Sequence, residues 1–249
     1  MSVIFPSLDT SRHQPTGFSP STAAPAPRRH ASSASSSGSA RPPTPYGRTP
    51  MNVTTWSLQM LEPSARAPRP FPEGVRLDLA TGITPEYARF LYALVGGNWN
   101  WTDRLGWTRQ PWADELAGPG VEFWILYSEG VPMGYAQLHP VVEADGTHVE
   151  ILYFGLAEQA LGRGLGGGFL EHGIAAAWTL PDRTGLPPTA RVWVHTCTLD
   201  GPAALANYQA RGLAVYKTEE TDQHVLDQPL GAWAATGGPA PTTDDDRGQ

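Results

Sequence analysis

The chain has 249 residues, a formal net charge of −7 and a single cysteine, Cys197. This length suits one substantial domain with tails, and a lone cysteine excludes an internal disulfide and fits a reducing compartment. An acidic chain lacks the basic face that binds nucleic acid, and no apolar run is long enough to span a membrane, so we expect a cytoplasmic protein that binds neither nucleic acid nor membrane.

The two ends of the chain differ from its body in composition. Residues 1–50 are rich in Ser, Pro, Ala and Arg and contain five arginines and one aspartate, which leaves about −11 for the rest. Such a segment buries too little apolar surface to offset its ordering entropy, so we predict a disordered leader. It is either a regulatory or targeting tail, such as a transit peptide, or, as we favour, an extension upstream of a start at Met51. Residues 232–249 are predicted to form a disordered acidic tail.

Between these ends, the hydrophobic pattern predicts alternating strands and helices. Residues 51–73 hold a short strand at 56–60 and a proline-rich linker, and the main domain is expected at residues 74–231. Thr84 and Pro85 are typical of a helix start, and Gly96-Gly97 of its end. The predicted elements are strands at 75–79, 122–127, 131–138, 147–154, 191–196 and 214–218, with a further one near 224–226, and helices from 85, near 111–117, from 165 and at 202–211.

The most informative stretch is the glycine-rich loop between the strand 147–154 and the following helix. It reads LGRGLGGG from Leu161 to Gly168. Glycines let backbone N–H groups approach a phosphate closely, and a helix N-terminus adds partial positive charge. The loop also fits the dinucleotide pattern GxGxxG, but it follows several strands and no acidic residue ends the next strand about 20 positions on. A glycine-rich turn without a ligand is the remaining alternative.

A second motif lies in the run VWVHTCTLDGPAALANYQARG, from Val192 to Gly212. Here Gly201-Pro202-Ala203-Ala204 precedes Tyr208 on a predicted helix. With the glycine loop and the strand order, this run resembles the GNAT superfamily of acetyl-CoA-dependent N-acetyltransferases, in particular a bacterial subgroup of generally unassigned acceptor. In that subgroup a V-T-T-W strand commonly opens the chain, as at Val53–Trp56. The resemblance covers roughly residues 75–220.

The superfamily motif Q/R-x-x-G-x-G/A aligns best with Leu161 to Gly166, where Leu161 replaces the usual Gln or Arg. A register starting at Gln159 would begin the helix two residues early. The resemblance implies an α/β (α+β) fold with a mixed, mostly antiparallel sheet of about six to seven strands and helices on both faces. It also implies that the cofactor is bound by Leu156, Ala157, Leu161, Gly162, Arg163, Gly164, Leu165, Gly166 and Gly167, with the backbone of Leu156 and Ala157 pairing with the pantetheine amides.

The resemblance further implies two catalytic residues. Glu150 lies eleven residues before Leu161, at the offset of the catalytic glutamate in the histone-acetylating branch, where it would deprotonate the amine directly or through water. Tyr208 matches the tyrosine that protonates the coenzyme A sulfur. The alternatives are a strand residue facing solvent or a structural partner for Glu150, and a packed helix-face aromatic for Tyr208.

Other residues carry weaker indications. Cys197 and His195 share a strand face and could suggest a cysteine nucleophile, but no carboxylate or amide partner is indicated. The tryptophans at 99, 101, 107 and 112 either wall the acceptor site or pack at the edge of a helical layer. We expect no metal.

The sequence therefore predicts an N-acetyltransferase that moves an acetyl group from acetyl-CoA directly to a primary amine. The acceptor would be a small molecule or a peptide, and a homodimer is compatible with this assignment. The alternatives are a non-catalytic acyl-CoA-binding module and, less favoured, a dinucleotide-binding oxidoreductase.

Overall fold

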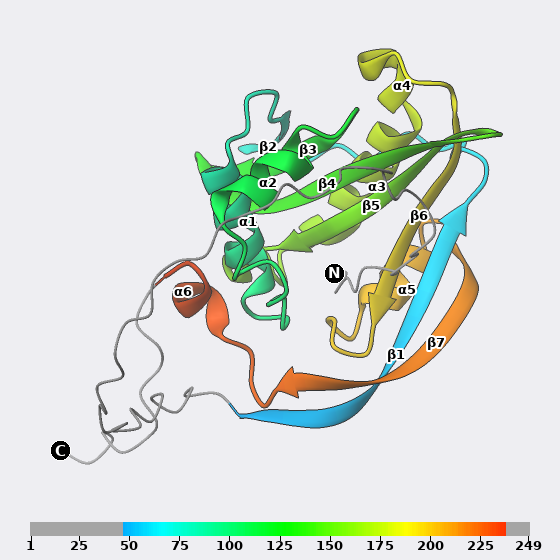
Figure 1. The fold of residues 1–249 in the computed structure, drawn as a ribbon. Coiled ribbons are helices and arrows are strands. Elements are labelled where there is room, and N and C mark those ends of the chain that lie inside the picture. The colour runs from blue at the N-terminus through cyan, green and yellow to red at the C-terminus, as the bar shows by residue number, and fades with distance from the viewer. Residues whose placement is uncertain (1–46, 238–249) are drawn as a thin grey trace, which may run out of the picture. The chain divides into compact units, whose positions relative to one another are not determined.

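The computed structural model of the chain describes residues 47–237 (Figure 1). Seven strands form one sheet in the order β2-β3-β4-β5-β6-β1-β7, in which β5 and β6 are parallel and every other neighbouring pair is antiparallel. This is the predicted mixed, mostly antiparallel α/β fold. The strands are β1 (Arg48–Met60), β2 (Val75–Leu79), β3 (Glu122–Ser128), β4 (Val131–Glu143), β5 (Gly146–Leu156), β6 (Thr189–Cys197) and β7 (Ala214–Leu226).

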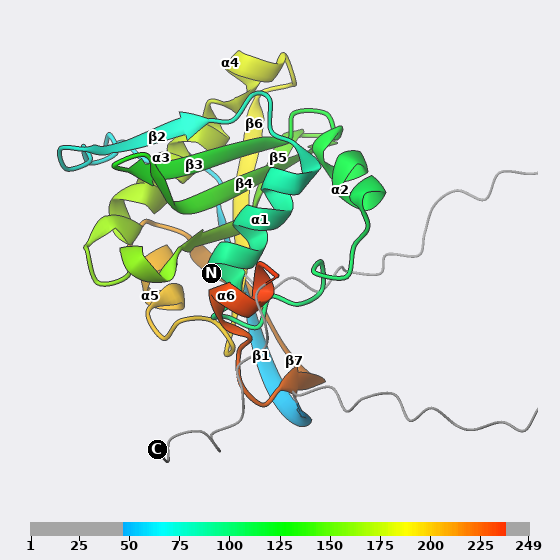
Figure 2. The same cartoon turned by 90° about the vertical axis from the view of Figure 1, so that its left-hand side faces the viewer.

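Helices cover both faces of the sheet (Figure 2), and each face has its own apolar core. On one face α3 and α5 pack over Val149, Ile151 and Val194, and on the other α1 and α2 pack over Phe123 and Tyr135. The helices are α1 (Pro85–Gly96), α2 (Arg109–Leu116), α3 (Leu165–Trp178), α4 (Leu180–Thr184), α5 (Ala204–Gln209) and α6 (Gly231–Ala235), with a 3-10 turn η1 (Glu158–Ala160).

The local signals act as expected at α1, and the expected strands at 122–127 and 131–138 form the β3–β4 hairpin. The Thr84 hydroxyl accepts a hydrogen bond from the N–H of Tyr87 at 3.3 Å, and Pro85 occupies the first helical turn. Between β3 and β4, Glu129 and Gly130 adopt positive φ angles of 53° and 81°, as a tight hairpin turn requires.

Among the boundaries that differ from the sequence prediction, three concern β1, β7 and α6. β1 begins at Arg48, inside the expected leader, because residues 48–50 pair with the end of β7. β7 is one strand of 13 residues rather than two short ones, since β1 provides a partner along its whole length. The expected tail from 232 to 249 starts too early, because α6 includes residues 232–235 and contacts α1. The remaining parts of the expected leader and tail, 1–46 and 238–249, lie outside the described residues.

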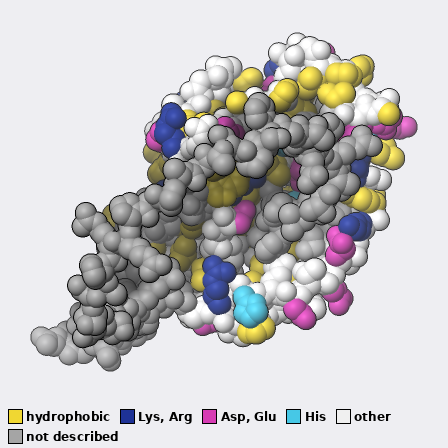
Figure 3. Space-filling model, viewed as in Figure 1, with side chains coloured by type: hydrophobic (Ala, Val, Ile, Leu, Met, Phe, Trp, Pro, Cys, Tyr) yellow, Lys and Arg dark blue, Asp and Glu magenta, His cyan; other side chains and the backbone are white. Residues whose placement is uncertain are grey.

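Charged side chains of both signs are interspersed over the visible part of the face drawn in Figure 3. Interspersed charges of both signs are ordinary for an exposed protein surface and do not indicate a particular binding partner.

Candidate active site

The neighbouring parallel strands β5 and β6 separate halfway along their length. They pair from Thr147 and Thr189 as far as Glu150 and Trp193, and then diverge (Figure 1). β6 continues beside β1, where Thr55 pairs with Cys197, while β5 continues beside β4. Beyond Glu150, the edge of β5 that faces β6 therefore has no strand partner within residues 47–237.

A β-bulge lies where β5 leaves β6. Gln137 of β4 pairs with Tyr153 and Leu138 pairs with Ile151, so Leu152 is the extra residue on β5. A bulge bends its strand and increases the local twist, which accounts for the separation of β5 from a neighbour that remains straight beside β1. The result is a free strand edge, which can accept hydrogen bonds from an extended ligand with amide groups.

The glycine loop follows at the end of β5 and opens α3. Gly162 and Gly164 have left-handed φ angles of 73° and 72°, and Gly164 is the residue that precedes the first turn of α3. A Cβ at either position would meet no heavy atom within 4 Å, so the loop faces open space. The first-turn N–H groups of α3 have no partner inside their own helix, and they point towards this space.

A cavity of about 530 Å³ joins the free edge of β5 to the glycine loop. Trp99 and the segment that leads into α5 complete its wall. Most of the predicted cofactor residues meet here, namely Leu156, Leu161, Gly162, Gly164, Leu165, Gly166 and Gly167. The structure therefore brings together, around one concavity, residues that the sequence analysis assigned to one ligand.

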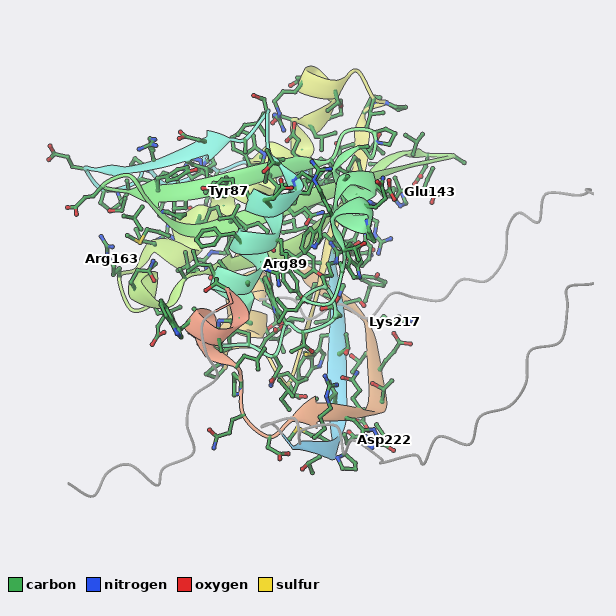
Figure 4. All side chains as sticks on the ribbon, turned by 60° about the vertical axis from the view of Figure 1, so that its left-hand side comes forward. Tyr87, Arg89, Glu143, Arg163, Lys217 and Asp222 are labelled. Atoms are coloured by element: carbon green, nitrogen blue, oxygen red, sulfur yellow. The ribbon has the colours of Figure 1, made fainter. Side chains whose placement is uncertain are left out.

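Two predicted cofactor residues have other partners. The N–H of Ala157 donates to the carbonyl of Met133 at 2.8 Å, and its carbonyl accepts from the N–H of Ala160. This N–H is thus already used within the protein and does not fit the expected pairing of Ala157 with pantetheine. The side chain of Arg163 (Figure 4) extends towards β3, where it lies 3.5 Å from the hydroxyl of Ser128.

Glu150 is the last β5 residue to pair with β6, and its carboxylate contacts His195. His195 Nδ1 lies 3.1 Å from Glu150 Oε1, and the two side chains are only 10% and 12% exposed. In the sequence, His195 stands out only together with Cys197, and no local pattern indicates its contact with Glu150. The parallel pairing of β5 with β6 was the signal that could have found it, because it places the two strands side by side.

Tyr208 lies on α5 and is fully buried in the core beneath α3. Its ring meets Phe154 edge-on, with 6.3 Å between the ring centroids, and Phe154 lines the cavity. Side chains alternate along a strand, so Glu150 points away from Val149 and Ile151, which belong to the same core cluster as Tyr208. The two candidate catalytic residues therefore lie on opposite faces of the sheet.

The thiol of Cys197 is poorly suited to nucleophilic attack. Burial, with the nearby carboxylate of Asp200, raises the pKa of Cys197 to about 12. Asp200 is itself buried, and burial raises its pKa, while it accepts hydrogen bonds from the Thr196 hydroxyl and the Cys197 N–H. A thiol with so high a pKa remains protonated at neutral pH, which argues against covalent catalysis through Cys197.

The tryptophan-rich segment divides between core and cavity. Trp101 and Trp112 are 1% and 2% exposed and belong to the core beneath α1, whereas Trp99 lines the cavity. The nearby acid Glu115 pairs with Arg104 at 3.1 Å in a largely buried ion pair. Asp103 accepts hydrogen bonds from the hydroxyls of Tyr92 and Tyr153. These acids are therefore engaged in structural contacts.

Within residues 47–237, no three His, Cys, Asp or Glu side chains gather closely enough to hold a metal ion. Helices in the same range are all too short or too polar to cross a membrane.

Comparison with known proteins identifies the family. Residues 83–213 match the profile of the Acetyltransferase (GNAT) family. No significant match was found among curated proteins. Similar solved structures include GCN5-related N-acetyltransferases from Sphaerobacter thermophilus and Kribbella flavida, at 16% and 20% identity and TM-scores of 0.44 and 0.43. A tandem GNAT protein from the clavulanic acid biosynthesis pathway is 18% identical, with a TM-score of 0.49.

These three structures cover 72%, 76% and 77% of this chain, which in turn covers 52%, 62% and 59% of theirs. The chain thus spans between half and two thirds of their length.

Proposed function

Because the chain belongs to the acetyltransferase (GNAT) family, whose members transfer acyl groups and generally use acetyl-CoA, we propose that it moves an acetyl group from acetyl-CoA directly to a primary amine. The observation that carries this proposal is the separation of β5 from β6 beyond Glu150, with a cavity that leads from the free strand edge to the glycine loop. A strand edge suits the amides of pantetheine, and the loop suits a pyrophosphate.

The residues around the cavity fit acetyl-CoA by their chemistry. The N–H groups at Gly164, Gly166 and Gly167 bind the pyrophosphate, since these residues put no side chain between ligand and backbone. The pantetheine pairs with β5 at Leu156 and the residues before it, because the N–H of Ala157 is engaged by Met133. Acetyl-CoA supplies an activated acyl group to this site.

Glu150 and Tyr208 move the protons of the reaction. An aliphatic amine has a pKa near 10 and is charged at neutral pH, so Glu150 removes a proton before the nitrogen attacks, directly or through water. His195 holds the carboxylate in place through its contact at 3.1 Å. As the C–N bond forms and the C–S bond breaks, Tyr208 gives its proton to the departing sulfur.

The proposal is tested first by binding and then by turnover. Calorimetry with acetyl-CoA on the full chain is expected to give a one-to-one complex, and a panel of small-molecule and peptide amines is then assayed for release of free thiol. Lack of acetyl-CoA binding would contradict the proposal. Tight binding without turnover on any amine would favour a non-catalytic acyl-CoA-binding module instead.

A further inference from the structure

Two arginines from distant parts of the chain converge on the first turn of α3. Arg69 belongs to the linker before β2, outside the region that matches the family, and Arg211 follows α5. A Cβ at Gly167 would overlap Arg211 Nη2 and would lie 2.6 Å from Arg69 Nη2. Both guanidinium groups therefore lie directly against the α3 backbone, beside the glycine loop.

One carboxylate lies close to both guanidinium groups. Glu171, one turn along α3 from Gly167, lies 2.8 Å from Arg69 Nη2 and 3.6 Å from Arg211 Nε. The cluster of Arg69, Arg211 and Glu171 therefore carries a net charge of about +1, although the whole chain carries −7. Two adjacent guanidinium groups repel each other, and a second anion beside them relieves this repulsion.

A second cavity begins at this cluster. It has a volume of about 740 Å³ and lies between linker residues 63–69, one side of α3 and the end of α5. Arg66, Arg69 and Arg211 line it together with Trp178. Gly167, which lies against both converging arginines, lines the cavity at the glycine loop, so the arginine cluster is close to both cavities.

The linker is held on α3 at the position of Arg69. The N–H of Arg69 donates to Glu171 at 3.1 Å, and the carbonyl of Arg69 lies 2.9 Å from His172 Nε2. Two residues further on, Phe71 stacks on the His172 ring with 4.5 Å between centroids. The Arg69 backbone is thus fixed before any ligand arrives, which lowers the entropic cost of using its side chain in binding.

We propose that Arg69 and Arg211 bind the 3′-phosphate of coenzyme A and that the adenosine occupies the cavity beneath linker residues 63–69. This inference rests on the proposed function. The adenosine diphosphate end of coenzyme A carries two anionic groups, a pyrophosphate and a 3′-phosphate. The pyrophosphate takes the N–H groups of the glycine loop, and guanidinium groups, which present paired donors in a planar fork, take the 3′-phosphate.

The test compares coenzyme A with 3′-dephospho-coenzyme A by calorimetry on the full chain. The natural chain is expected to bind coenzyme A about tenfold more tightly or better, since charge-assisted hydrogen bonds to a dianion are lost with the 3′-phosphate. Arg69→Gln and Arg211→Gln are each expected to reduce this preference several-fold while leaving the affinity for dephospho-coenzyme A unchanged. Arg109→Gln is the matched control, because Arg109 is exposed and pairs with Glu86 near α1 and α2.

Because Arg211 is partly buried, the melting temperature of Arg211→Gln is compared with that of the natural chain to check that the variant folds. If it does not fold, the exposed Arg69 provides the test. Equal affinity for the two nucleotides, or a preference that Arg69→Gln leaves undiminished, would overturn this inference and leave the proposed function standing. Failure to bind either nucleotide would contradict the proposed function itself.

Discussion

The glycines of the loop at the start of α3 have two different physical roles. Gly162 and Gly164 have positive φ angles, which side chains with a Cβ adopt at a cost. Gly166 and Gly167 lie in the helix itself, where glycine is not needed for the backbone conformation. At Gly167 the absence of a Cβ instead admits the guanidinium groups of Arg69 and Arg211.

This distinction gives a matched pair of variants at Gly164. Asn and Asp tolerate left-handed φ angles to a similar degree, and a Cβ at this position meets no neighbouring atom. Gly164→Asp is expected to abolish detectable acetyl-CoA binding in calorimetry, because its carboxylate repels the pyrophosphate. Gly164→Asn is expected to bind more weakly than the natural chain but still detectably, because its side chain narrows the approach to the backbone without adding a charge. If the two variants bind acetyl-CoA equally well, the loop does not hold the phosphates.

Glu150 is expected to show its role through the dependence of turnover on pH. Glu150→Gln should lower turnover at neutral pH by roughly 10²–10⁴-fold, the usual range for acid–base assistance. The defect should shrink as the pH rises towards the amine pKa, where the free base no longer needs help. Full activity of Glu150→Gln at neutral pH would place the base elsewhere.

His195 is a positioning residue in this scheme. His195→Ala should lower kcat without changing the affinity for acetyl-CoA, because Glu150 loses its partner at 3.1 Å. His195→Asn should recover much of the loss, since its amide N–H can take the place of Nδ1–H. If kcat of His195→Asn is as low as that of His195→Ala, the imidazole does not act through this hydrogen bond.

Tyr208→Phe keeps the ring that packs against Phe154 and removes only the proton donor. Turnover should fall, and a rise in pH should not restore it, because the missing proton belongs to the leaving sulfur and not to the amine. The melting temperature of the variant serves as the control for packing. Unimpaired turnover would mean that the sulfur takes its proton from solvent.

At the scale of the elements, the decisive strand is β1. It lies between β6 and β7 and is antiparallel to both, so Trp56 faces Thr196 on one side and Thr218 on the other. By holding β6 straight while β5 bends away at its bulge, β1 helps to keep the gap between β5 and β6 open. The N-terminal segment is thus an interior part of the sheet that carries the site.

The interior position of β1 predicts a large cost for truncating its core residue. Leu58 is fully buried in the core beneath α3, so Leu58→Ala should destabilise the fold by about 2–5 kcal/mol in urea unfolding. Met51→Ala, on the exposed part of the same strand, should change stability by roughly 0.5 kcal/mol or less. Similar values for the two variants would contradict the central placement of β1.

At the scale of the whole molecule, buried acids link stability to pH. Burial raises the pKa of Asp200 above its ordinary value of 3.8, so the folded state holds this proton more tightly than the unfolded state. The unfolded state therefore binds fewer protons between the two pKa values, and stability falls as the pH rises through this window. Above the folded pKa the full cost of a buried carboxylate is present.

Asp200→Asn should remove this fall of stability with rising pH, because the amide does not ionise. Its oxygen can still accept hydrogen bonds from the Thr196 hydroxyl and the Cys197 N–H. The free energy of unfolding of Asp200→Asn, measured relative to that of the natural chain, should increase as the pH rises from about 4 to neutrality. Urea unfolding at a series of pH values measures this difference. A constant difference across the range would mean that Asp200 titrates alike in the folded and unfolded states.

Local physics explains what the sequence predicted well. Helix α1 follows from Thr84 and Pro85, the β3–β4 hairpin from two apolar strands joined by a glycine turn, and the start of α3 from the glycine loop, since each depends on interactions within a few residues. The glycine loop and the Tyr208 motif sufficed to predict the family. The roles of Glu150 and Tyr208 remain predictions.

Long-range pairing decided the rest. No local pattern in β1 indicates that it lies between β6 and β7, because the partners of a strand are set by contacts far apart in the sequence. The same holds for the contact between Glu150 and His195, which are 45 positions apart, and for the convergence of Arg69 and Arg211 on Gly167. The sequence by itself determined most of the elements and the family, whereas only the tertiary structure decided which charged groups meet, because those distances depend on how the whole sheet is ordered.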